Sequence, residues 1–179
     1  MIELKNEKIA IPVVLFAGLL WSFGPLVVRY MDNPHMVPWQ YIFGRGLTIF
    51  IILNLYLYFE EGINFYKNYK KIGRSGAIGG CGLGIAMITF IYSITNTTAA
   101  VTLLCLAAMP FFTAILAYLF LKEKISLNVW ISIIIATVGI IIMALGNTGE
   151  KSLIGFVFGL TSSIGFSVFS VTLRWRKET

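Results

Sequence analysis

The sequence is poor in charged residues and in the side chains that enzymes use for catalysis. Charged residues make up 12% of its 179 residues, and it contains one histidine and two cysteines. A soluble domain is about 25% charged and about 45–50% apolar, whereas this chain is 58% apolar. The composition therefore argues against a water-soluble enzyme, and it excludes a disordered chain, which would be poor in apolar residues.

Six long apolar stretches follow one another along the chain. A helix needs about 20 mostly apolar residues to cross the hydrocarbon core of a bilayer. The stretches are Ile9–Val28, Pro38–Phe59, Gly76–Ser93, Thr98–Leu121, Leu127–Leu145 and Leu153–Leu173. They predict an all-α integral membrane protein with six transmembrane helices joined by short loops, and the lipid bilayer as its partner.

These stretches lack the groups that an intramembrane enzyme would need. None of them contains Asp or Glu, and Arg45 is the one basic residue inside them. The single histidine, His35, falls in a short loop, and Cys81 and Cys105 have no CxxC spacing. Because acid, base, nucleophile and metal-ligand groups are missing at membrane depth, we predict no catalytic residue, no metal and no cofactor.

The positive residues are distributed unevenly between the two sides of the predicted membrane. Basic residues concentrate in the cytoplasmic loops of membrane proteins. If the N-terminus is inside, the outer segments hold only Arg29 and Lys151. The inner segments then hold Lys5, Lys8, Lys67, Lys70, Lys71, Arg74, Lys122, Lys124, Arg174, Arg176 and Lys177. We therefore expect a multipass inner-membrane protein with both termini in the cytoplasm, and no nucleic-acid partner, because no single basic face is formed.

Small residues spaced four apart predict close helix contacts. Gly76, Gly80 and Gly84 form one such series in the third span, and Gly155 and Gly159 begin another in the sixth. In lipid, small residues let helix backbones approach closely. Two interpretations stay open for these faces: static packing, or surfaces that slide during transport.

Two residues inside the spans interrupt the apolar pattern. Arg45 lies about 10 Å along the second span from its start, at the rise of 1.5 Å per residue, where a charge costs several kcal/mol. It either extends to the outer headgroups or faces the helix interior and binds an anionic group. Pro110 cannot donate to the carbonyl of Leu106, so it predicts either a static kink or a place where a cavity forms.

The remaining polar residues in the spans are mostly hydroxyl-bearing. Most of them, including Ser162 and Ser167, are expected to satisfy backbone carbonyls or to bridge helices. A minority is expected to line a solute path. The candidate residues of that path are Trp21, Ser22, Arg45, Tyr92, Thr102 and Ser163.

The fourth and fifth spans carry an ordered series of residues that resembles a known family. In TTAAVTLLCLAAMPFFTAILAYLFLKEKISLNVWISIIIATVGIIIMAL, Pro110 is followed by Glu123 at the inner end, and then by Trp130 and Gly139. This order is similar to the EamA family of the drug/metabolite transporter superfamily. Trp21 and Arg45 also match, whereas Ser22 departs from the glycine that often follows the tryptophan.

The resemblance implies ten membrane helices in two inverted five-helix repeats, and transport of metabolites, often export of amino acids or related compounds. Residues 1–146 would form the first EamA repeat. Residues 147–179 would hold the sixth helix and the start of a second repeat. We therefore expect either a fragment that a second five-helix repeat completes or a half-size protein that forms a homodimer. The alternative function is a non-transporting membrane scaffold or assembly subunit.

Glu123 has two possible roles. It lies between Lys122 and Lys124, at the predicted cytoplasmic end of the fourth span. It therefore serves either in loop salt bridges and at the start of the next helix, or in gating.

Overall fold

The computed structural model describes residues 7–31, 38–62, 73–146 and 150–178, and its regular structure is helical throughout these ranges. The helices are α1 (Glu7–Arg29), α2 (Pro38–Glu61), α4 (Gly73–Asn96), α5 (Ala99–Ala107), α6 (Met109–Leu116), the π-helix η2 (Ala117–Leu121), α7 (Leu127–Gly146) and α8 (Glu150–Glu178). The predicted all-α architecture is confirmed at this level. The division into repeats stays a prediction.

Five helical segments are long and apolar enough to cross a membrane. They are Ile11–Val28, Pro38–Glu60, Gly73–Asn96, Ala99–Leu121 and Leu153–Trp175. The fifth predicted span, Leu127–Leu145, corresponds to α7, whose described apolar segment is Leu127–Ile142. The whole of α7 has 20 residues and, at a rise of 1.5 Å per residue, covers about 30 Å, which matches the thickness of the hydrocarbon core.

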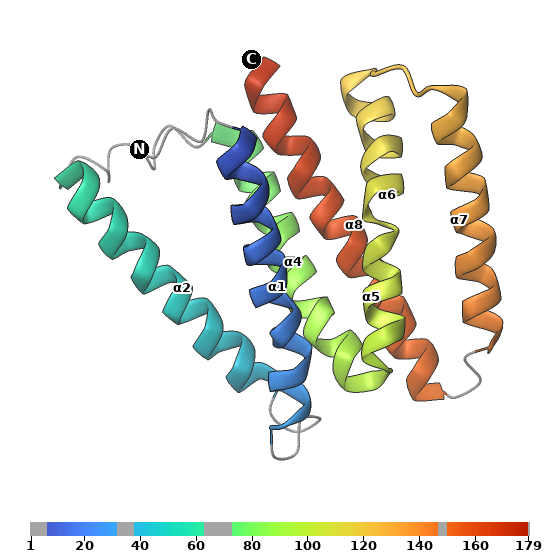
Figure 1. Cartoon of the computed structure of the whole chain (residues 1–179), viewed down its shortest axis with the longest axis horizontal. Helices are drawn as coiled ribbons and strands as arrows, with labels where there is room; N and C mark the ends of the chain where they lie inside the picture. Colours follow the sequence, from blue (N-terminus) through green and yellow to red (C-terminus); the bar gives the residue numbers. More distant parts are fainter. Residues whose placement is uncertain (1–6, 32–37, 63–72, 147–149, 179) are drawn as a thin grey trace.

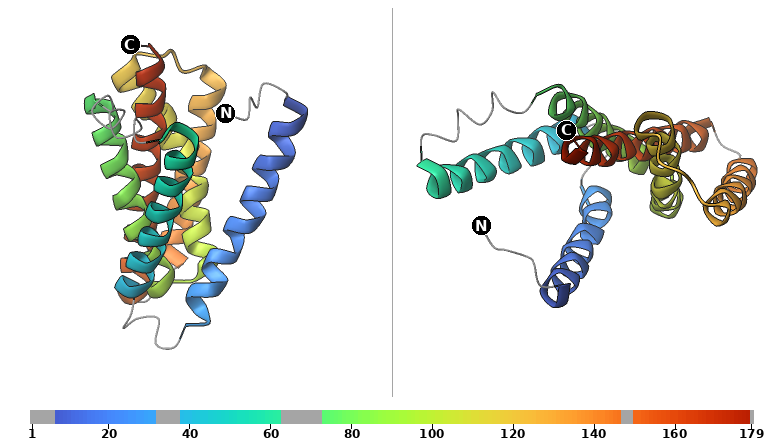
Figure 2. Two further views of the ribbon diagram at one scale, coloured as in Figure 1. Left: turned by 90° about the vertical axis from the view of Figure 1, so that its left-hand side faces the viewer. Right: turned by 90° about the horizontal axis from the view of Figure 1, so that it is seen from above.

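Helix α8 lies in the middle of the bundle. It packs along α4 on one side and along α5 and α6 on the other (Figure 1). Helix α7 is outermost beyond α6, and α1 stands off one face of the bundle, as the view from above shows (Figure 2). The start of α1 and the end of α8 lie at the same end of the bundle (Figure 1). This arrangement fits an even number of crossings.

Glycines bring α4 and α8 into close contact. Gly82 and Gly165 face each other, and a Cβ atom added to Gly165 would lie 2.7 Å from the carbonyl oxygen of Gly82. The predicted series in the third span is wrong in part, because Gly80 and Gly84 have open space where a Cβ would stand. Successive residues are about 100° apart around a helix. The face that meets α8 therefore carries Gly79 and Gly82, with Gly76 partly buried.

Gly155 and Gly159 lie where α8 approaches the turn between α4 and α5. A Cβ atom on Gly155 would lie 2.6 Å from the Cβ of Thr97. A Cβ atom on Gly159 would lie 2.9 Å from the Cβ of Cys105 and 3.0 Å from the Oγ of Ser93. These two glycines of the sixth span therefore occupy tight helix contacts.

Buried hydroxyl groups on α8 bind the backbone of its neighbours. Ser162 Oγ donates to the carbonyl of Ala86 on α4 (2.8 Å). Ser163 Oγ donates to the carbonyl of Cys105 (2.5 Å), and Ser167 Oγ donates to the carbonyl of Met109 (2.9 Å). The last two bonds fall on either side of Ala108, where the fourth span is broken. Because lipid offers no hydrogen bonds, these serines satisfy carbonyls that would otherwise depend on their own helix alone.

Ser162→Ala is expected to lower the free energy of unfolding by about 1 kcal/mol, since hydrogen bonds between membrane helices contribute about 0.6 kcal/mol on average and up to about 1.7. Thermal unfolding in detergent measures the change. Ser132→Ala is the matched control, because its exposed hydroxyl donates only within its own helix, to Asn128 (3.0 Å). Equal stability of the two variants would contradict a bridging role.

Candidate functional site

The fourth span departs from a regular α-helix at two places. It is broken at Ala108, between α5 and α6, where Pro110 lacks the N–H that would continue the hydrogen-bond ladder. Further along it widens into the π-helix η2 and ends at Lys122, whose φ of 57° is left-handed. Such π-helical segments are frequent at functional sites. The same span lines a polar cavity.

A cavity of about 640 Å³ opens beside α6, at the end of the bundle where α8 finishes. It lies between α6, the segment that leads into α7, the start of α7 and α8. Proline and polar residues that line it are Pro110, Thr113, Glu123, Lys124, Ser126, Ser170 and Arg174. We call it the Thr113 cavity. It brings together the two residues that the sequence marked for a kink or a gate, Pro110 and Glu123.

The hydroxyl of Thr113 is buried without a hydrogen-bond partner. The residue is 8% exposed, and its Oγ1 atom has no partner. Thr89 and Thr95, also buried on a helix, each donate to the carbonyl four residues earlier (2.8 and 3.1 Å). For Thr113 that carbonyl belongs to Met109, which accepts from Ser167 of α8. Buried polar groups are nearly always bonded, so the Thr113 hydroxyl is an exception among the described residues.

An ion pair stands at the mouth of the cavity. Arg174 Nη1 lies 3.2 Å from Glu123 Oε2, and the two side chains are 54% and 41% exposed. An exposed pair of this kind contributes about 0–1 kcal/mol. The pair therefore connects the loop after η2 to the end of α8 but is readily broken. Of the two predicted roles of Glu123, the structure describes the loop salt bridge, and gating stays a proposal.

The predicted aromatic residues of the solute path lie in helix contacts away from the Thr113 cavity. Trp21 stacks on Phe90 of α4, with ring centroids 5.5 Å apart, and meets Phe166 of α8 edge-on at 6.1 Å. Tyr92 meets Phe158 of α8 at 5.4 Å, and also Trp39 of α2. Trp21 therefore packs α1 against α4 and α8. Tyr92 belongs to α4 and contacts both α2 and α8.

The four remaining candidates are also separate from the cavity. Thr102 Oγ1 lies 2.8 Å from Ser93 Oγ, and both Thr102 and Ser163 are fully buried between helices. Ser22 is exposed and donates to the carbonyl of its own helix at Leu19 (2.7 Å). Arg45 is partly buried and makes no hydrogen bond or ion pair with any residue that the structure describes.

The sequence did not single out Thr113, Ser126 or Ser170. One signal was present, since Thr113 follows Pro110 by three residues and so lies one turn past the expected break. The bond from Ser167 to Met109, one turn before Thr113, comes from another helix. Spacing within one helix could not have indicated that contact.

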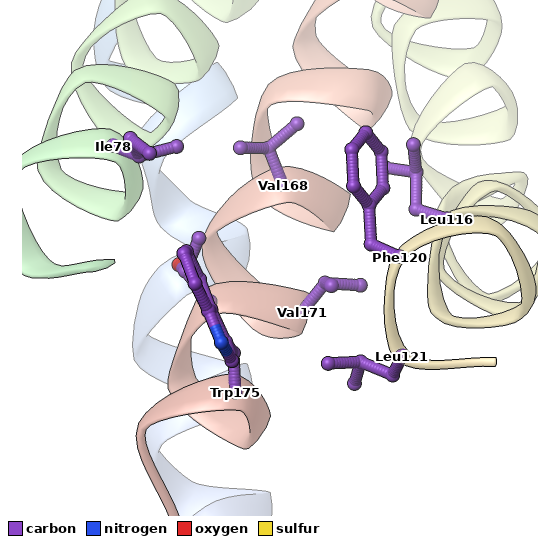
Figure 3. A pocket seen from close by; sticks show the side chains of 8 residues that line it. Ile78, Leu116, Phe120, Leu121, Val168, Val171 and Trp175 are labelled. Carbon is purple, nitrogen blue, oxygen red and sulfur yellow. The ribbon is translucent and has the colours of Figure 1, made fainter. Parts of the chain in front are cut away.

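A second cavity, of about 490 Å³, lies on the other face of α8 and is almost wholly apolar. Figure 3 shows Ile78 of α4 on one side of α8 and Phe120 of η2 on the other, with Val168 and Val171 between them. Its one hydroxyl lining residue, Thr172, already donates to the carbonyl of Phe169 (2.8 Å). This cavity therefore offers apolar contact and no free polar group.

Comparisons with known proteins match this chain to uncharacterized transporters. An uncharacterized transporter of Helicobacter pylori (strain J99) is 26% identical over 171 residues, which are 94% of this chain and 56% of that protein. An uncharacterized transporter of Clostridium kluyveri is 31% identical over 124 residues, which are 63% of this chain and 39% of that protein. The chain thus spans about half the length of the curated relatives it matches. No solved structure matches it.

The family resemblance inferred from the fourth and fifth spans is confirmed over most of the chain. The model of the EamA-like transporter family matches residues 8–145, which include every helix from α1 to nearly the end of α7. Members of this family are membrane transporters and not enzymes. The chain belongs to the EamA-like transporter family.

Proposed function

We propose that this chain forms part of a carrier that moves small metabolites across the inner membrane by alternating access, with export of amino acids or related compounds as its role. The family match and the transporter relatives support this proposal. Within the molecule, the observation that carries it is a broken membrane helix beside a polar cavity at one end of the bundle. Broken helices of this kind form solute sites in other carriers.

The proposed orientation places the Thr113 cavity on the cytoplasmic side. The end of the bundle where α8 finishes carries Lys122, Lys124 and Arg174, and the start of α1 lies at the same end. Cytoplasmic segments are rich in such residues. A solute leaving the cell would then reach the cavity first.

The proposed carrier is larger than the helices described here. Helices α1, α2 and α7 leave most of their apolar side chains exposed, including Phe16, Phe50 and Ile135. The relatives are almost twice as long as this chain. We propose that a second five-helix repeat, begun by residues 147–179, or a second copy of the chain packs on part of this surface, with lipid on the rest.

The close contacts around α8 suggest how such a carrier moves. The glycine faces of α4 and α8 carry few side chains that would interlock. Such thin faces permit one helix group to rock against another. The break at Ala108 lets α6 change its angle relative to α5. The hydrogen bonds from Ser163 and Ser167 on either side of the break are the contacts that break and form again in this movement.

Flux in proteoliposomes tests the proposal. The native protein, purified from the cells that make it, is reconstituted and supplied with labelled amino acids, nucleosides and cationic drugs. We expect accumulation of at least one amino acid above protein-free vesicles. Folded, correctly inserted protein that moves no solute of the panel would instead support the scaffold alternative.

A further inference from the structure

A continuous apolar groove runs along one face of α8. The apolar cavity of about 490 Å³ and a further cavity of about 440 Å³ share two lining residues, Ile78 of α4 and Val168 of α8. Figure 3 shows these two side chains in the space between α4 and α8. Because the two cavities meet at these residues, they form one groove, which we call the Val168 groove.

The groove follows a single stripe of side chains on α8. The residues of α8 that line it include Thr161, Ile164, Val168, Val171 and Trp175. They are three or four residues apart, so they lie on one face of the helix. The opposite face of α8 carries Phe166, which packs on Trp21 of α1. From Thr161 to Trp175 the groove is about 21 Å long, at a rise of 1.5 Å per residue.

The dimensions of the groove favour a hydrocarbon chain over a helix. A helix about 10 Å across would occupy roughly 1,600 Å³ over 21 Å, which is more than three times the volume of either cavity. A helix would therefore lie on the groove and not in it. One leaflet contributes half of the 30 Å hydrocarbon core, or about 15 Å. The groove is thus long enough to hold a lipid chain from the headgroup level to the middle of the bilayer.

Positive charge flanks one end of the groove. Arg74 lies on α4 one turn before Ile78, at the end of the stripe formed by Ile78, Cys81 and Ile85, which line the groove. On the other side, Lys122 follows the lining residue Leu121. Both basic residues are exposed, and neither forms an ion pair with a residue that the structure describes.

The remaining length of the groove is uncharged. Trp175 lines it at the same end as Arg74 and Lys122, and tryptophan is enriched at the level of the headgroups. No charged side chain is among the described residues that line the two cavities. The groove therefore has the polarity of a phospholipid, with charge at one end and hydrocarbon along the rest.

We propose that the Val168 groove binds an acyl chain of an anionic phospholipid, whose phosphate headgroup is held by Arg74 and Lys122. Basic residues next to a membrane span attract anionic lipids. A zwitterionic headgroup would bring its own positive charge near these two residues. The inference does not rest on the proposed function, because the groove and the Thr113 cavity lie on different faces of α8.

Fluorescence quenching by brominated lipids tests the occupant. The purified protein is reconstituted in vesicles of equal parts phosphatidylglycerol and phosphatidylcholine, with bromine near the headgroup end of the acyl chains of one lipid at a time. The difference between the unaltered protein and Trp175→Phe gives the emission of Trp175. We expect brominated phosphatidylglycerol to occupy the site at least fivefold more than brominated phosphatidylcholine.

Two results of this experiment would overturn the proposal. Equal quenching of Trp175 by the two lipids would show that the groove does not select a headgroup. No quenching by either lipid would show that protein covers the groove, either a second five-helix repeat or a second copy of the chain.

Arg74→Gln tests the charged end of the groove. We expect it to lower the preference for phosphatidylglycerol about fivefold, the effect of one basic residue near the membrane surface. Lys124→Gln is the matched control, because it also removes one exposed positive charge but lines the Thr113 cavity on the other face of α8. Its preference should stay within twofold of that of the unaltered protein. Equal preferences of Arg74→Gln and Lys124→Gln would contradict the headgroup site.

A second measurement does not need the Trp175 variant. Mass spectrometry counts the phosphatidylglycerol that stays with the protein after exchange into lipid-free detergent. We expect the unaltered protein to retain it, and Arg74→Gln and Lys122→Gln each to retain less than Lys124→Gln does. Failure of the unaltered protein to retain phosphatidylglycerol, or equal retention by all three variants, would overturn the proposal.

Discussion

Gly165→Ala is expected to destabilise the bundle by about 1–3 kcal/mol, the usual cost of adding a methyl group to a packed contact. The added Cβ would lie 2.7 Å from the carbonyl oxygen of Gly82 and 3.0 Å from the backbone nitrogen of Ala86. Both are backbone atoms, so no rotamer change relieves the overlap and α4 must move away from α8. That movement would also lengthen the bond from Ser162 to Ala86. The larger Gly165→Leu is expected to prevent folding.

Gly84→Ala is the matched control for this prediction. It lies on the same pair of packed helices, but nothing stands within 4 Å of its added Cβ. Alanine favours the helix over glycine by up to about 1 kcal/mol. Thermal unfolding in detergent should therefore show Gly84→Ala as stable as the unaltered protein or more so. Similar midpoints for Gly165→Ala and Gly84→Ala would contradict the observed contact between α4 and α8.

Arg45→Ala is expected to reduce transport at least tenfold while leaving the amount of protein in the membrane within about twofold. Arg45 is partly buried and has no bonding partner among the described residues. A charge at membrane depth costs several kcal/mol, so its loss should ease insertion. We propose that this charge is functional, and that it attracts an anionic group of the solute or holds carbonyls of the remaining helices.

Arg45→Lys separates charge from geometry. Lysine keeps the positive charge but cannot form the bidentate contacts of a guanidinium. We expect Arg45→Lys to recover part of the flux that Arg45→Ala loses, as measured in the same proteoliposomes. Full flux in Arg45→Ala would show that the arginine only extends to the headgroups.

Much of the fold could be predicted from the sequence, because membrane helices are determined by local composition. The apolar stretches overlap every helix that the structure describes, and Pro110 located the break in the fourth span. The hydroxyl residues Ser162 and Ser167 bridge helices as expected, since lipid leaves them few other partners.

The packing faces and the candidate site were less predictable, because they depend on how helices meet. The spacing of Gly76, Gly80 and Gly84 suggested a contact face. Yet the face that meets α8 is turned toward Gly79 and Gly82. Likewise, the bond from Ser167 to Met109 joins two helices. The spacing of residues along one helix predicts neither of these contacts between helices.

The central claim is that the solute passes through the Thr113 cavity beside the broken helix. Ser126→Cys places a thiol on the lining of this cavity, and Leu127→Cys places one on the next residue, which is 74% exposed and outside the lining. Both are made with Cys81→Ala, because Cys81 is also exposed. Flux is measured in proteoliposomes before and after complete labelling with a bulky thiol reagent. The account predicts that labelling abolishes flux in Ser126→Cys and spares Leu127→Cys; full flux through fully labelled Ser126→Cys protein would contradict it.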